Sequence, residues 1–243
     1  MTAEYKILKE QEHFWRIENG GVRAFLFEGT EKAMLVDTGF GNIPMKAIVT
    51  ELTSLPVFVV NTHADRDHTG CNGEFDEIYM NPADKDRCIH SLPQGGDPEK
   101  VLPLSEGDII DLGIWKFEVI FTPGHTPGSI MLFEREKRFL ISGDSIQNGM
   151  MYMFGEGRNV SELIASLEKI KAMSEDIQKI YPSHAECPLT SDIIQYVLSG
   201  AKALLTGELK SEEPPFPVPA KLYSAENISF LYNEEERTFG NLG

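Results

Sequence analysis

A dense group of metal-competent side chains lies in the stretch VVNTHADRDHTGCNG, residues 59–73. Two histidines and two aspartates, His63, Asp65, Asp67 and His68, occur within six residues, directly after an apolar run. Imidazole nitrogens and carboxylate oxygens are ligands that zinc, iron and manganese accept. Neither a salt bridge nor a hydrogen-bond motif needs this density of such groups, so the stretch predicts a metal site.

Three further candidate ligands occupy comparable positions later in the chain. His125 lies in VIFTPGHTPGS, Asp144 in FLISGDS and His184 in IYPSHAEC, and each follows an apolar run that is typical of a strand. Side chains at the ends of strands can converge on one edge of a sheet. In an extended segment, the alternate residues His63, Asp65 and Asp67 lie on one side, whereas the adjacent side chains of Asp67 and His68 point in different directions. This arrangement suits two neighbouring metals. We therefore expect a binuclear site.

A candidate substrate pocket follows Asp144 in the segment QNGMMYMFGEGR, residues 147–158. Met151, Tyr152 and Phe154 can line an apolar pocket, with Arg158 near its mouth. Packing of the same apolar residues in the core is the alternative. The residue pattern does not distinguish the two.

The candidate ligands must be positioned by a mixture of strands and helices. Short apolar runs between turn-forming residues predict antiparallel strands over residues 5–36. Further strands are expected near residues 56–60, 77–80, 108–112, 115–122, 129–134 and 138–143, and helices near 43–52, 83–92 and 192–205. Asn159 can cap another amphipathic helix, with Glu162 as its capping-box partner. Residues 207–219 are expected to form a surface linker, and a tail over residues 220–243 to complete a single domain over residues 1–243.

Composition restricts the class of protein. The chain has 243 residues, 41% of them hydrophobic, which is enough for a substantial core. Its net charge of −16, with no basic block, makes nucleic acid and anionic membranes poor partners, so we expect a small-molecule substrate and leave the oligomeric state open. Three cysteines without C-x-x-C spacing, and no signal-like or membrane-spanning stretch, favour a cytoplasmic protein.

The order THADRDHTG, TPGHTPGS, SGDS and PSH, after an early LVDTGFG, resembles the metallo-β-lactamase-fold hydrolase superfamily. The resemblance covers nearly the whole chain. It implies an α/β fold, a four-layer αβ/βα sandwich of two mixed β-sheets flanked by helices, with the metals at one edge. It also implies ligand roles: His63, Asp65 and His125 for the first metal, Asp67, His68 and His184 for the second, and Asp144 as a bridge.

Asp65 departs from the superfamily's H-x-H-x-D-H pattern, in which a histidine occupies this position. The sequence is similar here to the H-x-E-x-D-H motif of flavodiiron proteins, which share the fold and reduce oxygen or nitric oxide. An extra carboxylate lowers the charge of the cluster, so it is expected to weaken Lewis acidity and to favour iron or manganese. We expect two divalent transition-metal ions, zinc first, with iron or manganese as alternatives.

These observations predict a metal-dependent hydrolase in which Asp67 and Asp144 act at the catalytic centre. Two bound cations can supply a metal-bound hydroxide at neutral pH and polarise a carbonyl or phosphoryl oxygen. Ester, thioester, lactone and phosphodiester substrates all remain open. The alternatives are a di-iron redox enzyme of flavodiiron type without its own flavodoxin domain, and a metal-binding protein without turnover.

Overall fold

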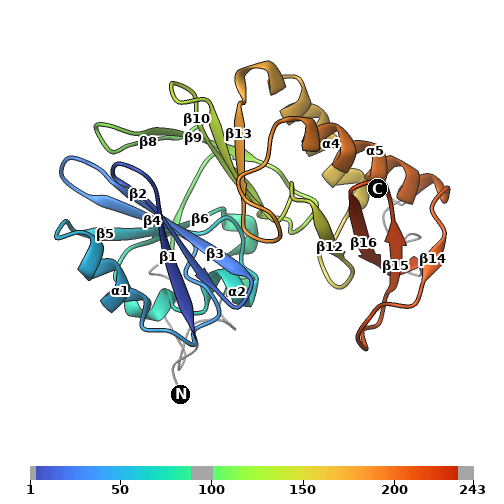
Figure 1. The fold of residues 1–243 in the computed structure, drawn as a ribbon, viewed down its shortest axis with the longest axis horizontal. Helices are drawn as coiled ribbons and strands as arrows, with labels where there is room; N and C mark the ends of the chain where they lie inside the picture. Colours follow the sequence, from blue (N-terminus) through green and yellow to red (C-terminus); the bar gives the residue numbers. More distant parts are fainter. Residues whose placement is uncertain (1–3, 89–100, 235–243) are drawn as a thin grey trace.

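Two mixed β-sheets stacked face to face form the centre of the computed structural model, which describes residues 4–88 and 101–234 (Figure 1). Sheet A has the strand order β1-β2-β3-β4-β5-β6-β7. Its strands are β1 (Tyr5–Gln11), β2 (Phe14–Asn19), β3 (Val22–Glu28), β4 (Ala33–Val36), β5 (Val57–Val60), β6 (Ile78–Met80) and β7 (Val101–Pro103). β1 to β4 form the expected antiparallel meander, and β4 to β7 continue the sheet in parallel.

Sheet B has the strand order β13-β11-β10-β9-β8. Its strands are β8 (Ile109–Asp111), β9 (Lys116–Phe121), β10 (Ile130–Glu134), β11 (Phe139–Gly143) and β13 (Lys179–Pro182). Only the β11–β13 pair is parallel, because the chain makes a helical crossover between these two strands. An aromatic core fills the space between sheets A and B, where the rings of Phe14 and Phe27 stack with centroids 4.3 Å apart.

Helices cover the outer faces of both sheets, which completes the predicted four-layer arrangement (Figure 1). α1 (Met45–Leu52) packs on sheet A, and α4 (Val160–Lys171) and α5 (Asp192–Thr206) pack on sheet B. Two short helices, α2 (Arg66–Thr69) and α3 (Lys85–Cys88), lie in loops of the first half, and the rest of the helix expected near 83–92 lies outside the described residues. The Asn159 side chain caps α4 as predicted, accepting from the backbone N–H of Ser161 and Glu162.

A third sheet, C, lies beside α4 and α5 and was not expected from the sequence (Figure 1). Its order is β12-β16-β15-β14, with β12 (Gly149–Met153), β14 (Ser211–Glu212), β15 (Lys221–Ser224) and β16 (Ile228–Tyr232). The expected linker over residues 207–219 therefore contains a short strand. The described part of the tail contributes β15 and β16, and β16 is an inner strand of sheet C because it pairs in parallel with β12 and antiparallel with β15. In the described part of the chain, no helix has the length and apolar content needed to cross a membrane.

Candidate metal centre

The candidate ligands lie in loops that follow strands of sheets A and B. The loop after β5 carries His63, Asp65, Asp67 and His68, the β9–β10 loop carries His125, Asp144 follows β11, and His184 follows β13. These loops converge, so that ligand atoms from both sheets lie within 4.8 Å of one another in three overlapping groups. The groups are His63, Asp65 and His125; His63, His68 and Asp144; and Asp67, His68 and His184. The first and third groups have the compositions expected for the two metal positions.

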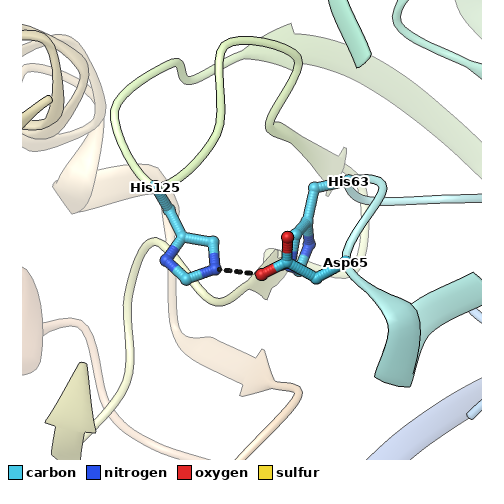
Figure 2. A group of neighbouring side chains, drawn as sticks. All are labelled: His63, Asp65 and His125. Carbon is cyan, nitrogen blue, oxygen red and sulfur yellow. Dashed lines mark ion pairs between the residues drawn. The ribbon is translucent and has the colours of Figure 1, made fainter. Parts of the chain in front are cut away.

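Figure 2 shows the first group, in which the two imidazoles and the carboxylate point toward one another. Asp65 Oδ2 lies 3.3 Å from His125 Nε2 and 3.6 Å from His63 Nε2. Asp144 lies beside both positions, because its oxygens approach the Nε2 atoms of His68 at 3.4 Å, His125 at 3.5 Å and His184 at 3.4 Å. This placement suits the bridging role implied for Asp144.

The donor set fits divalent metal ions. The Nε2 atoms of His63, His68 and His125 and the Oδ1 atom of Asp144 are buried without a hydrogen-bond partner. Buried polar atoms are rarely left unpaired, because each costs about 1–3 kcal/mol when it loses its partner. Converging unpaired nitrogens from imidazoles, beside carboxylates, are what a zinc or iron site requires before the ion binds.

Neighbouring groups fix the orientation of three of the imidazoles. His68 Nδ1 donates to Asp37 Oδ2 at 2.8 Å, His184 Nδ1 donates to the carbonyl of Gly21 at 2.8 Å, and His63 Nδ1 lies 3.0 Å from the Thr62 hydroxyl. Donation through Nδ1 leaves Nε2 free to bind a metal, which is the usual function of such partners.

Two buried aspartates hold the ligand loops, and the sequence analysis assigned a role to neither. Asp37 accepts from the backbone N–H and the hydroxyl of Thr62 as well as from His68. Asp84 accepts from the backbone N–H groups of Ala64 and Gly128 and so links the His63 loop to the His125 loop. The available signal for Asp37 was its place directly after an apolar run, the same place that identified Asp144.

Electrostatics differ between the two metal positions. Burial and the charge of Arg158 lower the pKa of His125 to about 4. Burial would also lower the pKa of His184, but Asp144 and Asp67 outweigh it and raise that pKa to about 10. Burial alone would raise the pKa of Asp65, yet contacts with His125 and His63 and the charge of Arg158 hold it well below its usual range. The first position therefore presents a carboxylate and neutral imidazole before any metal binds.

A cavity of about 540 Å³ opens over these groups. Its lining is Gly20, Phe40, Asp65, Asp67, His125, Asp144, Gln147, Met150, Tyr152, Arg158, His184 and Ala185. Tyr152 and Arg158, two of the residues predicted for a substrate pocket, therefore line this cavity. Phe154 lines a neighbouring cavity of about 520 Å³, which shares Asp65 and Arg158 with the first.

Met151 requires a correction, because it belongs to the core and not to the pocket. Its side chain is fully buried among the residues between sheet B, α4, α5 and sheet C. Successive side chains of β12 alternate between two faces, so Met151 and Met153 face the core while Met150 and Tyr152 face the cavity. The sequence left a pocket and core packing open as alternatives for these residues, and the alternation of β12 divides them between the two.

Comparisons with known proteins agree with this geometry. The model of the family described as the metallo-beta-lactamase superfamily matches residues 17–184. The chain is 27% identical over 214 residues to an acyl-coenzyme A thioesterase, MBLAC2, of Gallus gallus, covering 70% of this chain and 76% of that protein. It is 29% identical over 137 residues to a hydroxyacylglutathione hydrolase of Thermosynechococcus vestitus, covering 55% of this chain and about half, 51%, of that protein.

The fold has a similar counterpart among solved structures. A metallo-beta-lactamase from Pontibacter korlensis superposes with a TM-score of 0.68 at 16% sequence identity, covering 82% of this chain and 99% of that one. At this level of identity the likeness concerns the fold alone. It supports the layered architecture described above.

Proposed function

Because the chain belongs to the metallo-beta-lactamase superfamily, we propose that this metal-dependent hydrolase binds two metal ions, preferentially zinc, and cleaves thioesters. One observation carries the proposal: two ligand groups, each with unpaired donor atoms, lie side by side on the floor of a cavity that is open to a small molecule. The relatives named above, a thioesterase and a hydroxyacylglutathione hydrolase, supply the reaction class.

The ligand groups suggest which residues would hold each metal. His63, Asp65 and His125 would hold one metal, Asp67, His68 and His184 the other, with Asp144 between them. When bound, such ions act as Lewis acids, which lower the pKa of water and polarise a carbonyl oxygen.

The carboxylates lie where protons must move. Asp67 and Asp144 line the cavity, so a carboxylate oxygen of either residue that is not bound to metal could orient a water molecule and accept its proton. Asp67 Oδ2 lies 3.2 Å from His184 Nε2, so both of these atoms would face the second metal.

The walls of the cavity suit an acyl group. Phe40, Met150 and Tyr152 give it an apolar side, and Phe40 and Tyr152 remain 40% and 41% exposed. The Tyr152 ring stacks on Phe216, with centroids 6.4 Å apart, which extends an aromatic surface away from the metals. Burying an acyl chain on such a surface is favourable at about 25 cal/mol per Å² of apolar area.

The leaving group also favours a thioester over an oxygen ester. A thiol has a pKa of about 8.5, so a thiolate departs without receiving a proton. An alkoxide needs a general acid, and among the described residues that line the cavity Tyr152 is the one neutral proton donor of that kind. Its pKa is raised by burial and by Asp67 and Asp144, which makes it a poor acid at neutral pH.

A matched substrate panel tests this proposal. Zinc-loaded protein would be assayed with acyl-coenzyme A and acyl-glutathione thioesters, their oxygen-ester analogues, a lactone and an aryl phosphodiester. We expect kcat/KM for a thioester to exceed that of its oxygen analogue by about 100-fold or more, a transition-state difference of about 2.7 kcal/mol. Equal rates for both, or faster phosphodiester cleavage, would reject the thioester assignment.

Oxygen consumption in the presence of a reduced flavoprotein donor separates the hydrolase from the di-iron redox alternative. The expected result is no uptake above that of the Asp144→Asn variant. Rapid uptake by the iron-loaded protein, without hydrolysis of any member of the panel, would favour the redox enzyme.

A further inference from the structure

Asp65 is the ligand that departs from the superfamily pattern, and its surroundings explain how a carboxylate can stand there. The Asp65 side chain is 22% exposed and lies between the two imidazoles of its group and the guanidinium of Arg158. Arg158 Nη2 donates to Oδ2, the same oxygen that faces the Nε2 atoms of His63 and His125. A carboxylate oxygen accepts more than one partner, so this contact leaves a lone pair of Oδ2 directed at the histidines.

Arg158 holds two ligands of the same group at once. Its Nη1 atom donates to the backbone carbonyl of His125, while Nη2 holds Asp65. The Arg158 side chain is 9% exposed and comes from the turn between β12 and α4, where its own N–H donates to the carbonyl of Gly155. Because the guanidinium is planar and rigid, one side chain fixes the distance between the two loops.

The charges of the first group sum to zero when Arg158 is included. Imidazoles that bind metal are neutral, so two of them with one carboxylate and one guanidinium have the same formal charge as the three histidines of the usual pattern. Arg87 also approaches this group, with Nη2 3.6 Å from Asp65 Oδ1, but its Nε lies 4.0 Å from Asp84 Oδ1, so Asp84 balances its charge. At the second position, the ion-pair partners of Asp67 among the described residues are His68 and His184, and no arginine is one of them.

We propose that Arg158 is a positioning residue that cancels the charge of Asp65, so that the pair replaces a neutral histidine as a ligand of the first metal. This inference rests on the proposed metal centre. It also revises the expectation that Asp65 lowers the charge of the cluster, because that expectation counted the carboxylate without its arginine. The chain thus keeps the usual charge at this position while changing the ligand atom from nitrogen to oxygen.

A double-mutant cycle on zinc binding tests the pairing without reference to activity. Metal-free full-length protein, its Asp65→His and Arg158→Met variants and the double variant would be titrated with Zn²⁺ against a chromophoric chelator. We expect Asp65→His alone to weaken binding at the first position by at least about tenfold, equivalent to about 1.4 kcal/mol. The reason is that the new neutral histidine leaves a buried guanidinium unpaired beside the metal. The double variant should recover to within about threefold of the parent.

Matched controls separate pairing from general damage. Arg66→Met removes an exposed arginine from the loop that carries Asp65. Arg66 has no ion-pair partner among the described residues, so its loss should leave zinc binding unchanged. Arg158→Lys keeps the charge and should retain more affinity than Arg158→Met. Cobalt-loaded samples add a spectroscopic measurement. Asp65→His replaces a carboxylate ligand by an imidazole, which should change the visible absorption of bound Co²⁺. We expect this change in the Arg158→Met background, where the first metal position stays occupied.

The outcomes distinguish this inference from the proposed function. If the parent binds two zinc ions but Asp65→His binds them equally tightly, or if Arg158→Met has the same effect in both backgrounds, the pairing is wrong and the metal centre stands. If the parent folds but binds no zinc, both are wrong. Thermal unfolding of each metal-free variant, followed by circular dichroism, identifies any variant that fails to fold. If Arg158→Met does not fold, Arg158→Lys takes its place in the comparison with Asp65→His.

Discussion

At the scale of single residues, the function of the centre depends on buried carboxylates that do not bind metal themselves. Asp37 is fully buried and accepts hydrogen bonds from His68 and Thr62, and the Thr62 hydroxyl in turn contacts His63. One carboxylate thus orients two imidazoles that belong to different ligand groups of the proposed binuclear site. Sequence reasoning located both imidazoles but gave Asp37 no role, because a lone aspartate after a strand has no spacing that distinguishes it.

Replacing Asp37 by asparagine should weaken metal binding at both positions. The side chain keeps its size but loses the charge that favours donation from His68 Nδ1, and such changes cost about 10–100-fold in metal affinity or activity. Zinc titration and kcat/KM would be measured in parallel. Asp76→Asn, at a side chain that is 95% exposed, is the control and should change neither value. An Asp37→Asn variant with the parent's zinc affinity would show that the hydrogen bond to His68 is dispensable.

At the scale of elements, the sequence was informative where local signals are strong. The Asn159 cap, the meander over residues 5–36 and the strand-end positions of the ligands all rest on neighbouring residues, and the structure contains them. Sheet C was not expected because it depends on pairing between Gly149 and Ile228, which are distant in the sequence and carry no short-range signal. The same long-range pairing turned residues 149–153 into a strand and sent Met151 to the core.

The loop that carries His125 depends on a glycine packed against α4. A Cβ atom on Gly124 would lie 2.3 Å from the backbone nitrogen of Leu163, and φ at Gly124 is +135°. Gly124→Ala should therefore push the loop away from the helix, with a loss of unfolding free energy of about 1–3 kcal/mol. Binding at the first metal position should weaken, while the position formed by His68 and His184 is retained.

Gly107→Ala is the matched control for this change. Its φ of +81° is also unfavourable for alanine, but a Cβ there meets nothing within 4 Å. Its cost should be limited to about 1 kcal/mol of backbone strain, with zinc binding unchanged. Urea unfolding midpoints and zinc stoichiometry would be compared for the two variants. Equal losses in both variants would mean that contact with α4 does not position the His125 loop.

At the scale of the whole molecule, the metal centre joins the two sheets. Ligand groups combine loops that follow strands of sheet A with loops that follow strands of sheet B, so bound metal should stabilise the stacked arrangement. A ligand present at about 1,000 times its dissociation constant adds about 4 kcal/mol to the unfolding free energy. Chelation should lower the Tm measured by calorimetry, and added zinc should restore it. A Tm that is the same with and without metal would argue that the ions do not bridge the sheets.

The whole-molecule architecture was predicted from the resemblance of the ligand motifs to the metallo-β-lactamase-fold superfamily, and the strands and helices expected from local patterns were consistent with it. The sequence could not predict the charge balance at Asp65, since Arg158 is 93 residues away and only the folded chain brings the two together. The sequence therefore predicted a more negative metal cluster, because it counted only the ligand residues. The compensating positive charge comes from Arg158, which approaches Asp65 only in the folded chain.

Zinc titration of the metal-free protein, with thioester hydrolysis followed at each addition, tests the central claim most directly. The two ligand groups predict that activity rises until about two equivalents per chain are bound and then stays constant. Full activity at one equivalent, or hydrolysis at the same rate by the metal-free protein, would contradict a binuclear metal-dependent hydrolase.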